Sequence, residues 1–195
     1  ATWNRGCDRE RQIENRTSVD TRRVFVLRSE DHGRTWSRPE EITSGVKDPE
    51  WTWYATGPCH AIVKRRAPHK GRIVVPANHK RLENGGRVES YSQLLFSDDE
   101  GRTWQLGAVS QRGGNESTVA ELADGSLLLN MRHYERSDSL RLYAVSRDGG
   151  TSWDARGEHP ELVEPRCQGS LLNLTRGGRP TRRLLFCNPH DPRRR

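Results

Sequence analysis

Short apolar runs separated by turn residues recur along the chain, and they predict β-strands rather than helices. One set of runs ends just before clusters of polar residues and glycine, at residues 24–27, 94–96 and 142–145. A second set follows turn-forming residues, at residues 73–75, 127–129 and 184–186. Runs of three or four residues rich in Val, Leu and Phe are typical of short strands, and extended helical periodicity is almost absent.

An eight-residue phrase occurs three times. Its form is S-x-D-x-G-x-[TS]-W, and its copies occupy residues 29–36, 97–104 and 146–153. Each copy directly follows a strand of the first set. Five fixed positions that recur three times identify a structural repeat, and a repeat of this kind indicates a fold built from similar units.

The chemistry of this phrase predicts a locked turn between strands. An Asp at the start of a tight turn accepts hydrogen bonds from N–H groups that follow it, and Gly supplies a positive φ without steric cost. The Trp suits a plug between neighbouring sheets. Calcium binding is the alternative, but an EF-type loop needs a Glu at its twelfth position, where this chain has Ile42, Ser110 and His159.

Sheets of a few strands repeated along the chain predict an all-β fold, specifically a partial β-propeller over residues 1–195. The spacing accounts for about three blades and part of a fourth. The next Asp-bearing turn should fall past the last residue, so we expect the chain to stop inside a repeat. The longer first interval predicts inserted residues around 47–58 and 64–70.

Composition excludes an integral membrane protein with a spanning helix. Hydrophobic residues make up 31% and charged residues 30% of the chain, and the mean hydropathy is -0.96. No stretch approaches the ~20 apolar residues of a spanning helix. No secretion signal is recognisable at the start of the sequence, which leaves the localisation open.

The net charge of +7 favours anionic ligands in general. Arginine-rich stretches at residues 179–183 and 193–195 raise the alternative of a nucleic-acid binder. We rank it low and expect no nucleic-acid partner, because acidic residues are interspersed throughout and no base-stacking platform can be identified.

No metal or cofactor site is indicated by the cysteines and histidines. The four cysteines show no CxxC spacing and are expected to be free or buried thiols rather than disulfides: Cys7, Cys59, Cys167 and Cys187. The seven histidines show no HxxxH spacing. We therefore assign no metal ligand and no cofactor.

The repeated phrase resembles the Asp boxes, or BNR repeats, of the sialidases (exo-α-neuraminidases). Four segments between the boxes resemble those of bacterial and lysosomal members, at residues 53–58, 115–116, 129–132 and 186–189. The similarity runs through nearly the whole chain. The resemblance implies a six-bladed propeller and a hydrolase that releases terminal sialic acid from glycoproteins, glycolipids and oligosaccharides.

The chemistry of that reaction defines the groups it needs. The substrate carries a carboxylate at its anomeric carbon, which arginine forks bind bidentately. A carboxylate nucleophile would be repelled there, and sialidases use a Tyr instead. A neighbouring Glu draws off the phenolic proton, and a separate Asp serves as general acid and base.

Carried over by motif, the resemblance gives two residues of this chain the strongest roles. Arg132 resembles the second arginine of the family triad, and Glu116 resembles the glutamate that partners the Tyr. Glu121 competes with Glu116 as the inward carboxylate. Arg195 stands where the third arginine is expected, although Arg194 and Arg193 blur that register.

The acid/base and the sugar pocket are less sharply defined. Asp20 best fits the acid/base, with Asp8 as the runner-up, and a turn or capping role for Asp20 is the alternative. Trp53 and Tyr54 are candidates to line the sugar pocket, against plain packing as the competing interpretation.

Departures from the family pattern predict a central fragment that is inactive by itself. No Arg-Ile-Pro segment supplies the first arginine, and no residue matches the catalytic Tyr. Cys59 and Ala61 stand where family members usually have Gly, which predicts backbone strain if these positions need a positive φ. Because Asp boxes also occur in propellers without glycosidase activity, a non-catalytic glycan-binding propeller is the alternative function.

Overall fold

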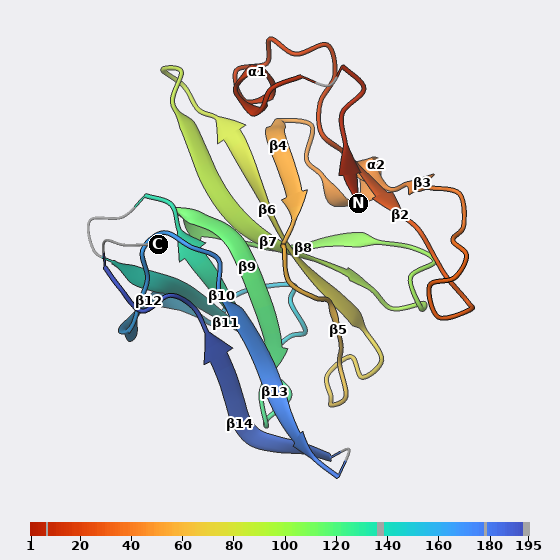
Figure 1. The fold of residues 1–195 in the computed structure, drawn as a ribbon, viewed down its shortest axis with the longest axis vertical. Coiled ribbons are helices and arrows are strands. Elements are labelled where there is room, and N and C mark those ends of the chain that lie inside the picture. Colours follow the sequence, from red (N-terminus) through yellow and green to blue (C-terminus); the bar gives the residue numbers. More distant parts are fainter. Residues whose placement is uncertain (7, 136–138, 178, 193–195) are drawn as a thin grey trace.

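The protein is an all-β structure with two very short helices, seen here in a computed structural model that describes residues 1–6, 8–135, 139–177 and 179–192 (Figure 1). The helices are α1 (Glu10–Glu14) and α2 (Thr43–Val46). The strands are β1 (Thr2–Trp3), β2 (Arg23–Val26), β3 (Glu40–Glu41), β4 (Trp51–Thr56), β5 (Ile62–Val63), β6 (Ile73–Leu82), β7 (Val88–Ser97), β8 (Gln105–Arg112), β9 (Gly114–Glu121), β10 (Leu127–His133), β11 (Leu140–Ser146), β12 (Ala155–Val163), β13 (Ser170–Arg176) and β14 (Arg179–Cys187).

Four antiparallel sheets follow one another in chain order. The first sheet is β1-β2-β3, the second is β4-β6-β7-β8 with β5 added against β6, the third is β9-β10-β11-β12, and the fourth is β13-β14. The second and third sheets are complete four-stranded blades, and no sheet among the described residues closes on itself. The expected all-β partial propeller is confirmed.

The second and third Asp boxes form the corners between β7 and β8 and between β11 and β12, and the first box lies between β2 and β3. In the second box, the Ser97 hydroxyl donates to Asp99 Oδ1 at 2.8 Å and accepts from the Gly101 N–H at 2.8 Å. Thr103 donates its N–H to Oδ1 at 2.8 Å and its hydroxyl to Oδ2 at 2.6 Å. Gly101 has φ +84°, which an L side chain rarely adopts. The other two boxes repeat these bonds, so both Asp oxygens are used within the turn.

The tryptophan of a box packs toward the preceding sheet. The Trp153 indole N–H donates to Val109 O on β8 at 2.9 Å, and the Ala108 N–H donates to Gly150 O at 2.8 Å. A Cβ on Gly107 would lie 2.6 Å from that Gly150 oxygen, so only glycine allows this approach. The predicted Trp plug between sheets is confirmed for the third box.

The hydrophobic core lies between the sheets rather than within any one of them. One buried cluster joins the second and third sheets: Val74, Leu94, Val119, Leu127, Leu129, Met131, Leu142 and Ala144. The other joins the first sheet and α2 to the second sheet: Val24, Val46, Trp51, Tyr54, Ala77 and Leu95. Because each large apolar side chain contributes ~1.5–3 kcal/mol when buried, the sheets depend on their neighbours for stability.

Two expectations from the sequence were wrong. Residues 47–58 are not simply an insertion, because they contain β4, the first strand of the second sheet. Cys59 and Ala61 are not strained by a positive φ, because the non-glycine residues with positive φ in the described chain lie elsewhere.

Neither helix of the described chain is long or apolar enough to cross a membrane.

The tryptophan of the box is buried to different extents in the first and third repeats, so replacing it in each gives a matched pair of substitutions. Trp153→Ala removes a ring packed against the core and should lower the free energy of unfolding by about 3 kcal/mol. Trp36→Ala should lower the free energy of unfolding by less than about 1 kcal/mol, because Trp36 in the first box is 61% exposed. Urea unfolding of both variants measures the difference, and equal costs would contradict the plug between sheets.

The box carboxylates should make the fold sensitive to acid. Hydrogen bonds from Thr35 and Thr103 lower the pKa of Asp31 and Asp99 from 3.8 to about 2. Their stabilising contribution is therefore complete above the ordinary pKa and is lost as the pH falls toward 2. The urea midpoint should drop between pH 5 and pH 2.5, and Asp99→Asn should reduce that drop. The variant Glu30→Gln is the control, and an unchanged pH dependence in Asp99→Asn would exclude this cause.

Candidate active site

Glu116 and Arg132 meet at a β-bulge between β9 and β10. The register pairs Met131 with Ser117 and His133 with Gly114, so two residues of β9 oppose the single residue Arg132 on β10. Bulges of this kind re-aim side chains and are common beside active sites. The guanidinium Nη1 of Arg132 lies 2.7 Å from Glu116 Oε2. The structure thus brings together the two residues given the strongest roles from the sequence.

The Arg132 guanidinium keeps donors available. Its side chain is 16% exposed and that of Glu116 is 34% exposed, so the pair lies at the edge of the core rather than inside it. The buried Nε of Arg132 has no hydrogen-bond partner. The guanidinium carbon lies 5.3 Å from the ring centroid of Tyr134, which holds the arginine by a cation–π contact. This arrangement can bind an anion without first breaking a buried network.

Lys80 joins the same region from the second sheet, and the sequence interpretation missed it. Its Nζ lies 5.0 Å from the Tyr134 ring centroid and 2.9 Å from Glu10 Oε1 of α1, and it also pairs with Glu14. Burial opposes the charged form of Lys80, but the two carboxylates outweigh it and raise the pKa of Lys80. The spacing of Glu10 and Glu14 on one helix face was the only sequence signal of this contact.

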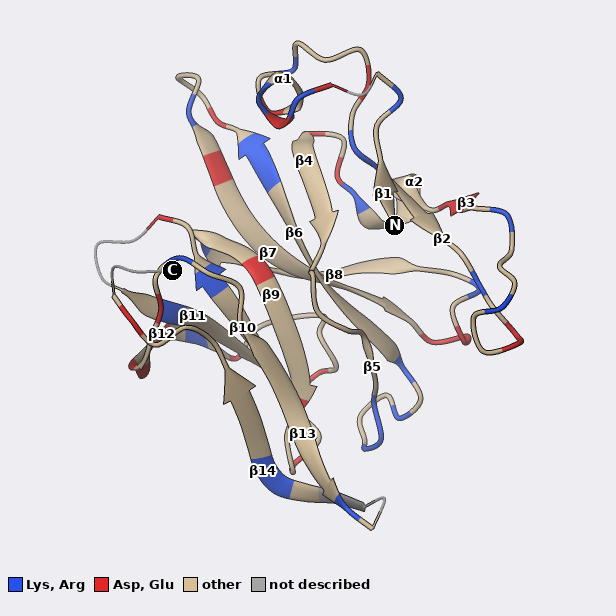
Figure 2. Cartoon of the chain, viewed as in Figure 1, with Lys and Arg blue, Asp and Glu red and all other residues tan. Residues whose placement is uncertain are grey.

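The basic end of β6 lies toward the part of the molecule that carries α1 (Figure 2). Ion pairs join Lys80 to Glu10 and Glu14, and Arg132 to Glu116. Opposite charges are paired in this group, which leaves the unused donors of Arg132 as its anion-binding groups.

Asp20 lies in a pocket of about 340 Å³ between the α1 segment and the start of β4. Arg23 donates two hydrogen bonds to Asp20, from Nε to Oδ2 at 2.9 Å and from Nη2 to Oδ1 at 3.1 Å. The Asp20 side chain is 11% exposed. The hydrogen bonds from Arg23 lower the pKa of Asp20, which favours the carboxylate over the acid. The runner-up, Asp8, accepts the Val19 N–H at 3.2 Å.

The two aromatic candidates differ in accessibility. Trp53 is partly exposed, and the Arg22 guanidinium carbon lies 4.2 Å from its ring centroid. Tyr54 is 0% exposed and packs in the core between the first and second sheets, where burial raises its pKa. Tyr54 therefore offers no surface to a sugar in this arrangement.

Glu121 lies at the far end of β9 from Glu116 and is already neutralised. Lys64 Nζ lies 3.1 Å from one of its oxygens, and the backbone N–H groups of Arg65 and Arg66 donate to it at 2.8 and 3.0 Å. Its side chain is 7% exposed. These bonds account for Glu121 as a structural residue, which leaves Glu116 as the candidate carboxylate for the reaction.

The third arginine candidate and the four cysteines are only partly covered by the described residues. Arg195 lies outside the described residues. Cys59, Cys167 and Cys187 are free thiols, and Cys7 lies outside the described residues as well. Within the described chain, no group of three or more His, Cys, Asp or Glu side chains could hold a metal ion.

Comparison with known proteins matches this architecture. The family profile described as BNR repeat-like domain matches residues 10–195. A sialidase of Bacteroides fragilis is 28% identical over 205 residues, which cover 100% of this chain and 35% of that protein. Mouse Sialidase-2 is 30% identical over 192 residues, covering 92% of this chain and 49% of that protein.

A solved structure also aligns closely. The Hadza microbial sialidase Hz136 superposes with a TM-score of 0.73 at 31% identity, covering 90% of this chain and 33% of that protein. The chain thus spans about a third to a half of the length of these relatives. The repeated corners, the successive sheets and these matches lead to one assignment: the chain belongs to the BNR repeat-like family, among the sialidases built on Asp-box propellers.

Proposed function

We propose that this chain carries part of the active site of a retaining sialidase that releases terminal sialic acid from glycoconjugates. The observation that supports this most is the Glu116–Arg132 pair at the bulge between β9 and β10, with 2.7 Å between Nη1 and Oε2. Membership of the family supports the reaction type. The relatives named sialidase suggest sialylated glycans as the partners of the whole protein.

Arg132 is proposed to bind the substrate carboxylate. Its guanidinium is always charged, and a planar fork holds a carboxylate through two parallel bonds. Glu116 occupies Nη1 and the Tyr134 ring lies beside the guanidinium, so Nη2 is the donor proposed to bind the ligand. Arg195 is proposed as the third arginine of the same clamp.

Glu116 is proposed to accept the proton of a tyrosine nucleophile from outside this chain. Oε2 is held by Arg132, and the side chain is 34% exposed, which leaves the other oxygen accessible to a phenol. A neutral phenol becomes a better nucleophile when a neighbouring carboxylate takes its proton. Arg132 keeps that carboxylate oriented while it does so.

Asp20 stays a prediction as the acid/base. A general acid must hold a proton near the working pH, whereas the ion pair with Arg23 favours the ionised form of Asp20. The ion pair would have to open during catalysis for Asp20 to act. Otherwise Asp20 orders the turn before β2, and Asp8 takes its place as the candidate. Trp53 remains the aromatic candidate for the sugar pocket.

Binding of 3′-sialyllactose to the chain tests the arginine directly. Arg132→Ala should weaken binding by at least about tenfold, because a charge-assisted contact is lost. Arg34→Ala, which changes an exposed arginine of the first box, should leave the affinity unchanged and serves as the control. Titration calorimetry measures both, and equal affinity in the Arg132 and Arg34 variants would reject the proposed carboxylate site.

Turnover separates the enzyme from a non-catalytic glycan-binding propeller. The 195 residues alone should not cleave a fluorogenic sialoside, and normal turnover would overturn the expected need for a tyrosine from outside. In a protein extended to the length of the relatives, Glu116→Gln should still bind sialoside but cleave it about 10²–10⁴-fold more slowly. Binding without cleavage by the unsubstituted extended protein would favour the alternative function.

A further inference from the structure

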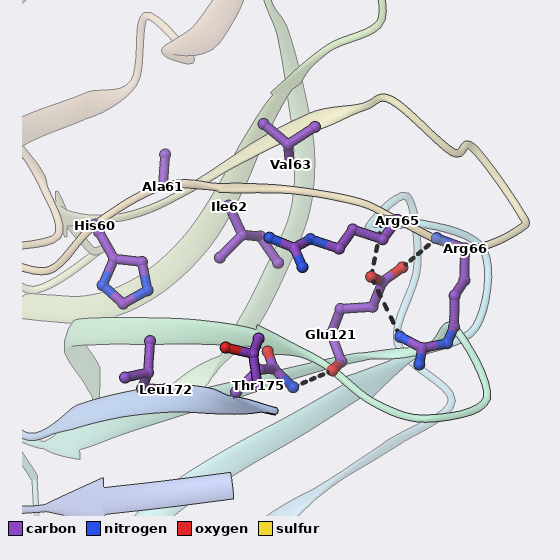
Figure 3. Close-up of a pocket in the computed structure, with 10 residues that line it drawn as sticks. His60, Ala61, Ile62, Val63, Arg65, Arg66, Glu121, Leu172 and Thr175 are labelled. Atoms are coloured by element: carbon purple, nitrogen blue, oxygen red, sulfur yellow. Dashed lines mark hydrogen bonds and ion pairs between the residues drawn. The ribbon is translucent and has the colours of Figure 1, made fainter. Parts of the chain in front are cut away.

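A pocket of about 460 Å³ lies between the segment that follows β4 and the strand β13, with the end of β9 at its side (Figure 3). Its walls come from the segment 60–66, from Glu121 at the end of β9 and from residues 172–175 of β13. Its volume falls in the range of pockets that bind small molecules.

This pocket is separate from the Glu116–Arg132 site. Glu116 and Glu121 are five residues apart on β9, and a strand advances roughly 3.4 Å per residue, so their backbones lie about 17 Å apart. Nothing in the proposed reaction uses the residues at the Glu121 end of the strand.

The pocket carries an excess of positive charge because its one acid is already compensated. Glu121 is bound by Lys64 Nζ at 3.1 Å, by two backbone N–H groups, and by the Arg66 guanidinium at 3.9 Å. The Arg65 side chain extends away from Glu121 and past Ile62 (Figure 3), and within the described residues its guanidinium has no partner. An unpaired guanidinium fork in a pocket is suited to a carboxylate.

The remaining walls suit the rest of a sugar. Leu172 is 49% exposed and Val63 is 56% exposed, so apolar surface is available for the C–H face of a ring. Asn173 donates Nδ2 to Glu121 O at 2.6 Å, which leaves its Oδ1 to accept from a hydroxyl. The Thr175 hydroxyl and the His60 ring complete the polar rim.

We propose that this pocket is a second binding site, for a monosaccharide that carries a carboxylate, with Arg65 as its anion-binding group. The proposal does not depend on the reaction proposed for Glu116 and Arg132. The expected ligand is a sugar acid rather than a bare anion, because apolar and hydroxyl-binding walls flank the Arg65 guanidinium.

Titration calorimetry with N-acetylneuraminate tests the site, using the Arg132→Ala chain so that the first proposed site is weakened. Arg65→Gln in that background should raise the Kd by at least about tenfold, because the charged contact is lost. Arg34→Gln, at an exposed arginine far along the chain, is the matched control and should leave the Kd within about twofold. Thermal unfolding of the Arg65 variant should be unchanged, since this side chain is exposed.

Other probes define the ligand class. Glucuronate should bind and should lose affinity in Arg65→Gln, whereas the neutral N-acetylmannosamine should bind weakly to both. Binding that disappears with Arg132→Ala and ignores Arg65→Gln would overturn this inference and leave the proposed function standing. Inorganic phosphate that binds as tightly as either sugar acid would also overturn it, because the walls would then contribute nothing.

Discussion

The contact between an Asp-box corner and the sheet before it is the interaction on which the rest of the structure depends. At the third box, Trp153 donates to Val109 O and Gly150 O accepts from Ala108, so the corner of one sheet is bonded to the outer strand of the preceding one. The carboxylate of Asp148 holds the corner in shape. Since both buried clusters lie between sheets, a sheet that lost this contact would expose its apolar face.

That packing also fixes where chemistry can occur. β9 is the first strand of the third sheet and packs against β6 of the second and β13 of the fourth, so it is covered from both sides. Its two glutamates are placed in contrasting environments, with Glu116 beside Arg132 at a bulge and Glu121 among compensating donors. One strand thereby borders both the candidate active site and the proposed second pocket.

Sequence reasoning predicted the central strands of the blades but not their first and last strands. β6, β7, β10 and β11 carry the apolar runs beside the boxes because both of their faces are covered. β9 begins with polar residues such as Asn115 and Ser117, which are buried, and β12 is largely exposed, so neither strand begins with an apolar run. Glu116 and Arg132 could be chosen by motif, whereas the Lys80 contact with α1 joins segments about seventy residues apart and follows only from the packing.

Hydrogen exchange at the Trp153 indole and the Ala108 amide tests the central claim most directly. Both groups donate across the boundary between the second and third sheets. If the corners hold the sheets together, both should exchange only through global opening and be protected as strongly as the Leu129 amide in the core. Exchange at the rate of an exposed loop, while Leu129 stays protected, would show that the sheets are stable without the corner contact and would contradict the account.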